Sequence, residues 1–168
     1  MSSPLYRVSN GASPGAAAGV KVTTGTSIKT LLQLLHPNNA IRVVEWGISF
    51  DGFAAATPIE CELIHTTTVA ATVTAYVAND VTLLTDPAAN VPGLTLSTTG
   101  SGYTASGEGS VVAPVRIGDY QLVAPTNQYL KQFPLGQEFV VPAAGVLRIR
   151  VTAAAAVNAI CYVTFAVG

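Results

Sequence analysis

Residues 41–52 carry the clearest alternation of apolar and polar side chains in the chain. From Val44 onward, large apolar residues stand at every second position, and small or charged residues stand between them. This two-residue period is typical of a β-strand with one buried face. The dipeptide Asp51-Gly52 suits a tight turn, because both residues tolerate positive φ angles. We therefore predict a central strand that places Val44 and the only tryptophan, Trp46, on its buried face.

Other segments repeat this pattern between clusters of Gly, Pro and Asn, and each predicts a short strand. These segments are residues 59–65, 72–77, 120–124, 129–133, 137–141, 146–152 and 159–167. Residues 28–35 fit either one face of a helix or one face of a strand. The short connection through residues 36–39 favours a strand in a hairpin. Residues 93–109 are rich in Ser, Thr and Gly and are expected to form a long loop.

About eight to ten short strands with no convincing helix predict an all-β fold, an antiparallel β-sandwich or jelly roll. Residues 1–20 contain small side chains and turn formers without a period, so we expect them to form an extended N-terminal arm. Residues 21–168 are predicted to form one domain, as the length of 168 residues suits a single core.

The composition is unusually apolar for a free monomer. Hydrophobic residues make up 49% of the chain and charged residues only 10%, against about 25% in typical soluble domains. Mean hydropathy is +0.46. Such a chain suits either a bilayer or permanent packing against other protein chains. The longest uncharged stretch, residues 151–168, contains several polar side chains and much Ala, so we expect no membrane partner.

The charge pattern argues against nucleic acid as a partner. The net charge is -1, and no dense Lys/Arg cluster offers a phosphate-binding face. Arg148 and Arg150 come closest to one. They alternate with apolar residues, so we expect them on the solvated outward face of a strand. Cys61 and Cys161 lie within apolar strand patterns and are predicted to be buried free thiols.

No residue pattern identifies a catalytic, cofactor-binding or metal-binding site, and we do not expect an enzyme. His36 and His65 are the only histidines and have no nearby third ligand for a metal. Glu60 and Glu62 share a strand face, a geometry seen in glycosidase acid pairs, but alternation with apolar residues is explained more simply by a solvent face.

Several runs along the chain resemble small head proteins of tailed bacteriophages, similar to jelly-roll capsid decoration (cement) proteins. The runs are residues 42–52, 62–64, 134–142, 147–153 and 156–158, and the resemblance spans residues 29–168. It implies a homotrimer seated on the outside of the virion shell after assembly in the host cytoplasm. The major capsid protein would be its partner.

Two other functions remain open from the residues. A receptor- or glycan-binding module of a phage tail or fibre would need an exposed aromatic platform, for which Tyr103, Tyr120 and Tyr129 are the candidates. A hydrolase on a jelly-roll scaffold would depend on Glu60 or Glu62.

Overall fold

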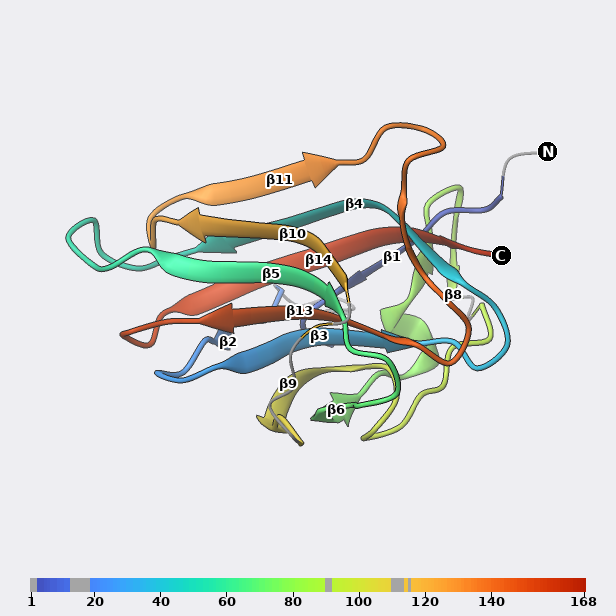
Figure 1. Cartoon of the computed structure of the whole chain (residues 1–168), viewed down its shortest axis with the longest axis horizontal. Coiled ribbons are helices and arrows are strands. Elements are labelled where there is room, and N and C mark those ends of the chain that lie inside the picture. The colour runs from blue at the N-terminus through green and yellow to red at the C-terminus, as the bar shows by residue number, and fades with distance from the viewer. Residues whose placement is uncertain (1–2, 13–18, 90–91, 110–113, 115) are drawn as a thin grey trace.

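The chain folds into two antiparallel β-sheets packed face to face (Figure 1). The structure is a computed structural model that describes residues 3–12, 19–89, 92–109, 114 and 116–168. Sheet A consists of β1 (Tyr6–Ser9), β2 (Val22–Thr23), β4 (Ile41–Phe50), β7 (Thr82–Leu83), β8 (Asp86–Ala89), β11 (Gln128–Gln132), β12 (Phe139–Val141) and β14 (Asn158–Val167). Sheet B consists of β3 (Lys29–Leu35), β5 (Ile59–His65), β6 (Thr72–Ala75), β9 (Gly102–Gly107), β10 (Arg116–Val123) and β13 (Val146–Thr152). A 3₁₀ turn, η1, spans Ala78–Asp80.

The order of strand pairing identifies the sandwich as a jelly roll. Eight strands pair as a nested set: β1 with β14, β3 with β13, β4 with β11, and β5 with β10. The pairs fall alternately in the two sheets, which gives the orders β1-β14-β4-β11 and β3-β13-β5-β10. A long antiparallel hairpin wrapped into two facing sheets has this connectivity. The predicted fold class is confirmed.

The predicted central strand is β4, but a bulge changes which of its side chains are buried. Glu45 pairs with Thr164 and Val43 pairs with Phe165, so Val44 is the extra residue between them. A bulge shifts the alternation by one position. Val43 therefore points into the core, while Val44 is half-buried on the outside, and its predicted place on the buried face is wrong. Beyond the bulge the alternation holds, and the Trp46 ring is fully buried.

Residues 28–35, which fit either element type, form the strand β3. Strands β5 and β13 begin and end at the predicted residues. Strand β9 lies inside the expected loop 93–109 and pairs with both β3 and β6. Its Gly- and Ser-rich sequence has no apolar alternation, so backbone pairing with its neighbours, which the sequence does not reveal, fixes it as a strand.

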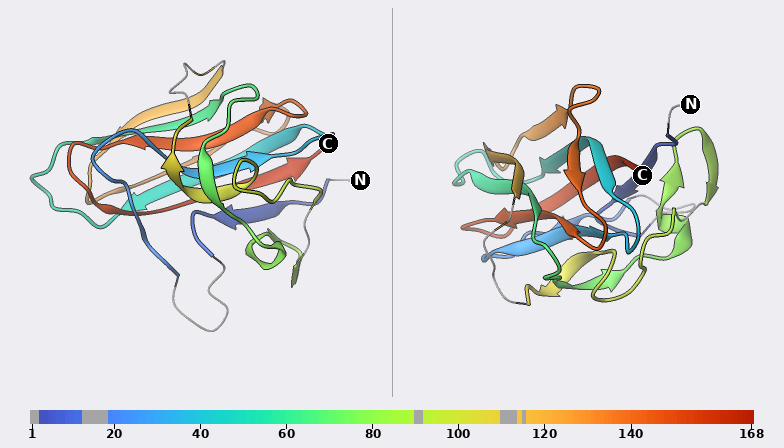
Figure 2. Two further views of the ribbon diagram at one scale, coloured as in Figure 1. Left: turned by 90° about the horizontal axis from the view of Figure 1, so that it is seen from below. Right: turned by 45° about the vertical axis from the view of Figure 1, so that its right-hand side comes forward.

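Part of the expected N-terminal arm belongs to the sandwich. Strand β1 lies between β14 and β7, and Tyr6 and Val8 point into the core. Two alternate apolar residues give too short a period to stand out in a sequence of small residues. Residues 13–18 of the arm lie outside the described part of the chain. Figure 2 shows β1 lying alongside β14 in sheet A.

The core fills the space between the sheets and includes both cysteines. Cys61 on β5 and Cys161 on β14 are buried and free, as predicted. Burial raises the pKa of the Cys61 thiol to about 12. Both thiols are therefore protonated and unreactive near neutral pH.

Candidate interaction surface

The outer face of sheet B is covered by its own chain over β13, and this overturns the prediction for Arg148 and Arg150. Their exposed fractions are 0% and 4% instead of those of a solvated face. Arg148 donates to Glu108 Oε2 at 3.2 Å and to the carbonyl oxygen of Val69. Arg150 donates to Glu62 Oε2 at 2.7 Å. The strand alternation correctly gave their direction, but it carried no information about the segments that lie over β13.

The two predicted acidic residues of β5 have different surroundings. Glu60 is exposed, whereas Glu62 is held by the Arg150 guanidinium. The two side chains share a face, as expected, but Glu62 has a structural role in the pairing of β5 with β13.

The two histidines lie apart and have different contacts. The His36 Nε2 lies 2.8 Å from the carbonyl oxygen of Pro92, and its Nδ1 accepts the backbone N–H groups of Asn38 and Asn39. His65 is buried, and neither of its ring nitrogens has a hydrogen-bond partner among the described residues. No group of three His, Cys, Asp or Glu side chains in the described ranges could hold a metal ion.

The three tyrosines proposed as a platform do not share a surface. The Tyr103 ring lies 5.3 Å from Tyr76 and packs against the core, and the Tyr129 ring lies 5.6 Å from Trp46. Tyr120 is exposed on the outer face of sheet B. A sugar could therefore stack on Tyr120 alone, and not on a continuous aromatic platform.

Sequence reasoning missed a buried carboxylate, Asp119, that joins the two sheets at the side where β10 and β11 lie (Figure 1). Asp119 accepts hydrogen bonds from Trp46 Nε1 at 3.1 Å, the Tyr129 hydroxyl at 2.8 Å and Gln121 Nε2 at 3.0 Å. Burial alone would raise its pKa, but these hydrogen bonds and Lys131, 3.5 Å away, hold the pKa below its ordinary value. All these contacts are internal, so Asp119 is a structural link and not a free acid.

The outer face of sheet A, in contrast, has no layer over it in the described part of the chain. We call this surface the sheet A face. Its outward positions include Arg7, Ser9, Arg42, Val44, Glu45, Gly47, Ser49, Gln128, Leu130, Gln132, Ile160, Tyr162 and Thr164. Leu130 is 59% exposed and Ile160 42% exposed. Large apolar side chains that stand open on a flat sheet are typical of a protein–protein contact.

A fixed cluster of three side chains occupies the middle of the sheet A face. The Tyr162 hydroxyl donates to Glu45 Oε1 at 2.6 Å, and Arg7 donates to the same oxygen at 3.1 Å. The Arg7 guanidinium also lies 4.1 Å from the centre of the Tyr162 ring. Burial, followed by the bond to Glu45, raises the pKa of Tyr162 to about 12. The cluster therefore joins β1, β4 and β14 across the face and pairs its two opposite charges.

Gly47 allows this cluster to lie flat on the sheet. A Cβ atom at position 47 would stand 2.6 Å from Tyr162 Cε1, so any side chain there would displace the ring. Strand alternation marked Glu45 and Gly47 as outward positions. It could not bring them to Arg7 and Tyr162, which come from opposite ends of the chain.

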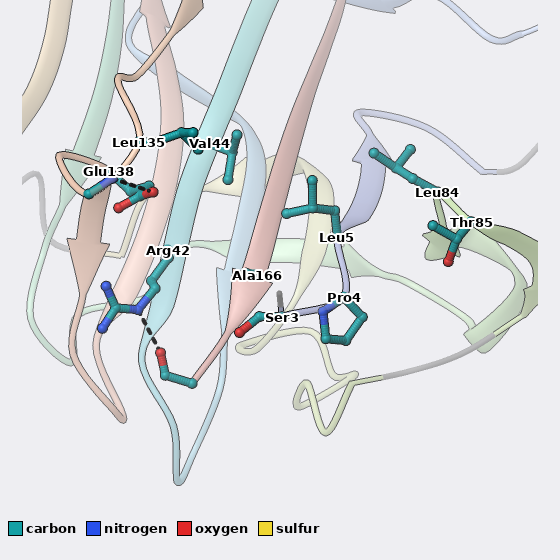
Figure 3. Close-up of a pocket in the computed structure, with 12 residues that line it drawn as sticks. Ser3, Pro4, Leu5, Arg42, Val44, Leu84, Thr85, Leu135, Glu138 and Ala166 are labelled. Carbon is teal, nitrogen blue, oxygen red and sulfur yellow. Dashed lines mark hydrogen bonds between the residues drawn. The ribbon is translucent and has the colours of Figure 1, made fainter. Parts of the chain in front are cut away.

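A groove of about 880 Å³ continues the sheet A face at the end where β4 begins (Figure 3). Its apolar lining residues are Leu5, Val44, Leu84, Leu135 and Ala166. Leu135 is 92% exposed. At one wall, Arg42 Nε donates to the carbonyl oxygen of Gly168 at 2.7 Å. The backbone N–H of Gly136 donates to Glu138 and lowers the pKa of that carboxyl.

Comparisons with models of protein families, with curated proteins and with solved structures each gave no match. Within the described residues, no helix has the length and apolar character needed to cross a membrane. The open sheet A face and its groove are therefore the features of this chain on which a functional argument rests.

Proposed function

We propose that this chain is a structural protein of a tailed-bacteriophage virion, a capsid decoration (cement) protein. It binds the outside of the major capsid protein shell as a homotrimer and stabilises the shell. The observation that carries the proposal is a jelly roll whose sheet A face and adjoining groove are open, expose large apolar side chains and pair the opposite charges of Arg7 and Glu45. A chain with only 10% charged residues needs partners to cover such a surface.

The groove is the part of this surface that we assign to the shell. Ser3, Pro4 and Leu5 line one side of it, and the exposed Leu135 stands on the other. The N-terminal segment can thus contribute to shell contact without leaving the domain. A trimer would present three such grooves, and simultaneous contacts turn modest single affinities into strong retention.

Co-sedimentation with empty capsids of the phage that encodes the chain tests the proposal. The wild-type protein should saturate the capsids at a fixed ratio, and Leu135→Asp should reduce the amount bound at least tenfold. Leu122→Asp, at a position that is 65% exposed on β10 of sheet B, is the matched control and should bind as the wild type does. Wild-type protein that does not co-sediment would refute the proposal.

A deletion of residues 1–19 would remove β1 from the core, so its effect on binding would be uninformative. Deletion of residues 1–4 leaves β1 intact and tests the N-terminal wall of the groove. Binding to a glycan array by a protein that ignores capsids would instead support a receptor-binding module of a tail or fibre.

A further inference from the structure

The charges of the sheet A face restrict what can cover it. Among the described residues its outward charges are Arg7, Glu45 and Arg42. Arg7 and Glu45 neutralise each other at 3.1 Å, and Arg42 stands at the groove end, where its charge acts on the Glu138 carboxylate. The remaining polar residues there are Ser, Gln and Thr. A surface without net charge does not attract a strongly charged partner, and it does not repel an identical surface.

The shape of the face also suits self-association. A shallow hollow of about 240 Å³ lies over Gly47, and its lining includes Leu130, Ile160 and Tyr162. The exposed side chains of Leu130 and Ile160 project beside this hollow as knobs. A face that holds both a knob and a hollow can pack against a copy of itself, either around a two-fold axis or in a closed ring.

The extent of the face suits a contact of modest size. Its two ten-residue strands, with the five residues of β11 and the four of β1, present on the order of 500 Å² in projection. A standard interface buries about 800 Å² per partner, so a contact made by this face alone belongs to the smaller class of specific interfaces. Arg and Tyr, which form the rigid cluster at its centre, are also enriched among the side chains that dominate binding energy.

We propose that the sheet A face binds a second copy of this chain, with Leu130 and Ile160 of one copy packed into the hollow over Gly47 of the next. The inference rests on the self-association part of the proposed function and assigns that role to one surface. The groove remains available to the shell at the end of the sandwich.

Mass measurement by light scattering after size exclusion tests this assignment in the absence of capsids. We expect the wild-type protein to be oligomeric, and Leu130→Glu and Ile160→Glu to weaken self-association at least about thirty-fold, as loss of a central apolar contact does. Leu122→Glu places the same charge on an equally exposed position of sheet B and should keep the wild-type mass. Circular dichroism checks that each variant is folded.

Introduced cysteines give a second measurement that does not depend on destabilising a contact. Because Cys61 and Cys161 are buried, a short bis-maleimide should link only a thiol placed on the surface. Ile160→Cys should give covalent dimers at low protein concentration, and Leu122→Cys should not.

The outcomes separate this inference from the proposed function. A monomeric wild type, or an oligomer whose mass and cross-linking do not respond to changes at positions 130 and 160, overturns the assignment of the face. Capsid co-sedimentation tests shell binding independently. If the Leu130 and Ile160 variants lose capsid binding but keep the wild-type mass, the face binds the shell and the inference is wrong.

Discussion

The two outer faces of the sandwich differ in how far the chain covers their charged side chains. On sheet B, the chain covers the strand β13 with its own segments and buries two arginines in ion pairs with Glu62 and Glu108. On sheet A, the single ion pair remains partly open to solvent, and aliphatic side chains stand uncovered beside it. The arginines of β13 are thus covered within the monomer, although Tyr120 and Leu122 of β10 stay exposed, whereas the sheet A face has no covering segment in the described part of the chain.

The difference also changes how the composition should be interpreted. Two of the eight cationic residues lie beneath the surface of sheet B, so they contribute nothing to the solvated exterior. The surface is therefore even poorer in charge than the sequence indicates. On the sheet A face, the charges of Arg7 and Glu45 are paired with each other.

The largest loss of unfolding free energy is expected at the buried ion pair between Arg148 and Glu108 on sheet B. Glu108→Ala removes the carboxylate that pairs with the fully buried Arg148 and that accepts the Thr30 hydroxyl at 2.7 Å. A buried charge left without its partner costs about 3 kcal/mol or more of unfolding free energy. Urea denaturation followed by tryptophan fluorescence measures this loss.

Glu60→Ala is the matched control, because Glu60 is an exposed glutamate on the same outer face. Its effect should stay within about 0.5 kcal/mol. Equal losses of unfolding free energy in the two variants would show that the buried Arg148 does not require its ion pair with Glu108.

Two glycines give a second contrast between the sheets. Gly102→Ala on β9 would drive the new methyl group into the backbone carbonyl oxygen of Thr74, which cannot move without breaking the pairing of β6 with β9. We expect a loss of about 3 kcal/mol. In Gly47→Ala the methyl group meets only the Tyr162 ring, which can turn towards solvent, so the loss should be about 1 kcal/mol.

Thermal unfolding of both glycine variants measures this contrast. A loss in Gly47→Ala as large as that in Gly102→Ala would mean that the Tyr162 ring is as immobile as backbone, and that the sheet A face is more rigid than its exposure indicates.

The fold could be predicted from the sequence because long strands with one buried face repeat their apolar residues every second position. Strand β5 follows this rule from Ile59 to Leu63, and β13 follows it from Leu147 to Val151. It failed at Val44, because a bulge depends on the partner strand, and at β9, because Gly, Ser and Thr have no preferred face. It also missed β1, where two apolar residues are too few to form a pattern.

The candidate surface was less accessible to prediction because it is made by pairing over long sequence distances. Nothing local to Arg7, Glu45 or Tyr162 indicates that the three side chains meet. In the same way, the alternation of Arg148 with apolar neighbours gave its direction correctly but said nothing of Glu108, which follows the end of β9. The alternation along a strand predicts which face of the sheet a side chain occupies, but it does not predict which segments cover that face.

A pH-dependent loss of stability should come from His65, which is buried and whose ring nitrogens have no hydrogen-bond partner among the described residues. Burial and the neighbouring Arg116 lower its pKa, so the folded protein binds fewer protons than the unfolded chain. Protonation therefore favours unfolding. As the pH falls below about 6.5, the unfolding free energy should decrease by up to about 1.4 kcal/mol per pH unit until the lowered pKa is reached.

His65→Leu should remove most of this slope, because it replaces the imidazole with an apolar side chain of similar size. Urea denaturation between pH 5 and 7.5, spanning roughly the ordinary histidine range, measures it. Asp119 should not contribute in this window, since its pKa lies below the ordinary carboxyl value. An unchanged slope in the variant would exclude His65 as the source.

The smallest effect on monomer stability is expected at the open ion pair. Glu45→Gln leaves Arg7 unpaired, but Arg7 is partly exposed and can turn to water, so the loss should be below about 1 kcal/mol. Self-association should respond more strongly, because each sheet A face then carries one positive charge and two copies repel each other at low salt. The double variant Arg7→Gln/Glu45→Gln restores a neutral face and should recover the wild-type mass in light scattering. A loss of unfolding free energy in Glu45→Gln as large as that in Glu108→Ala would mean that the Arg7–Glu45 pair on sheet A is as closed to water as the Arg148–Glu108 pair on sheet B. That result would contradict the proposed difference between the two outer faces.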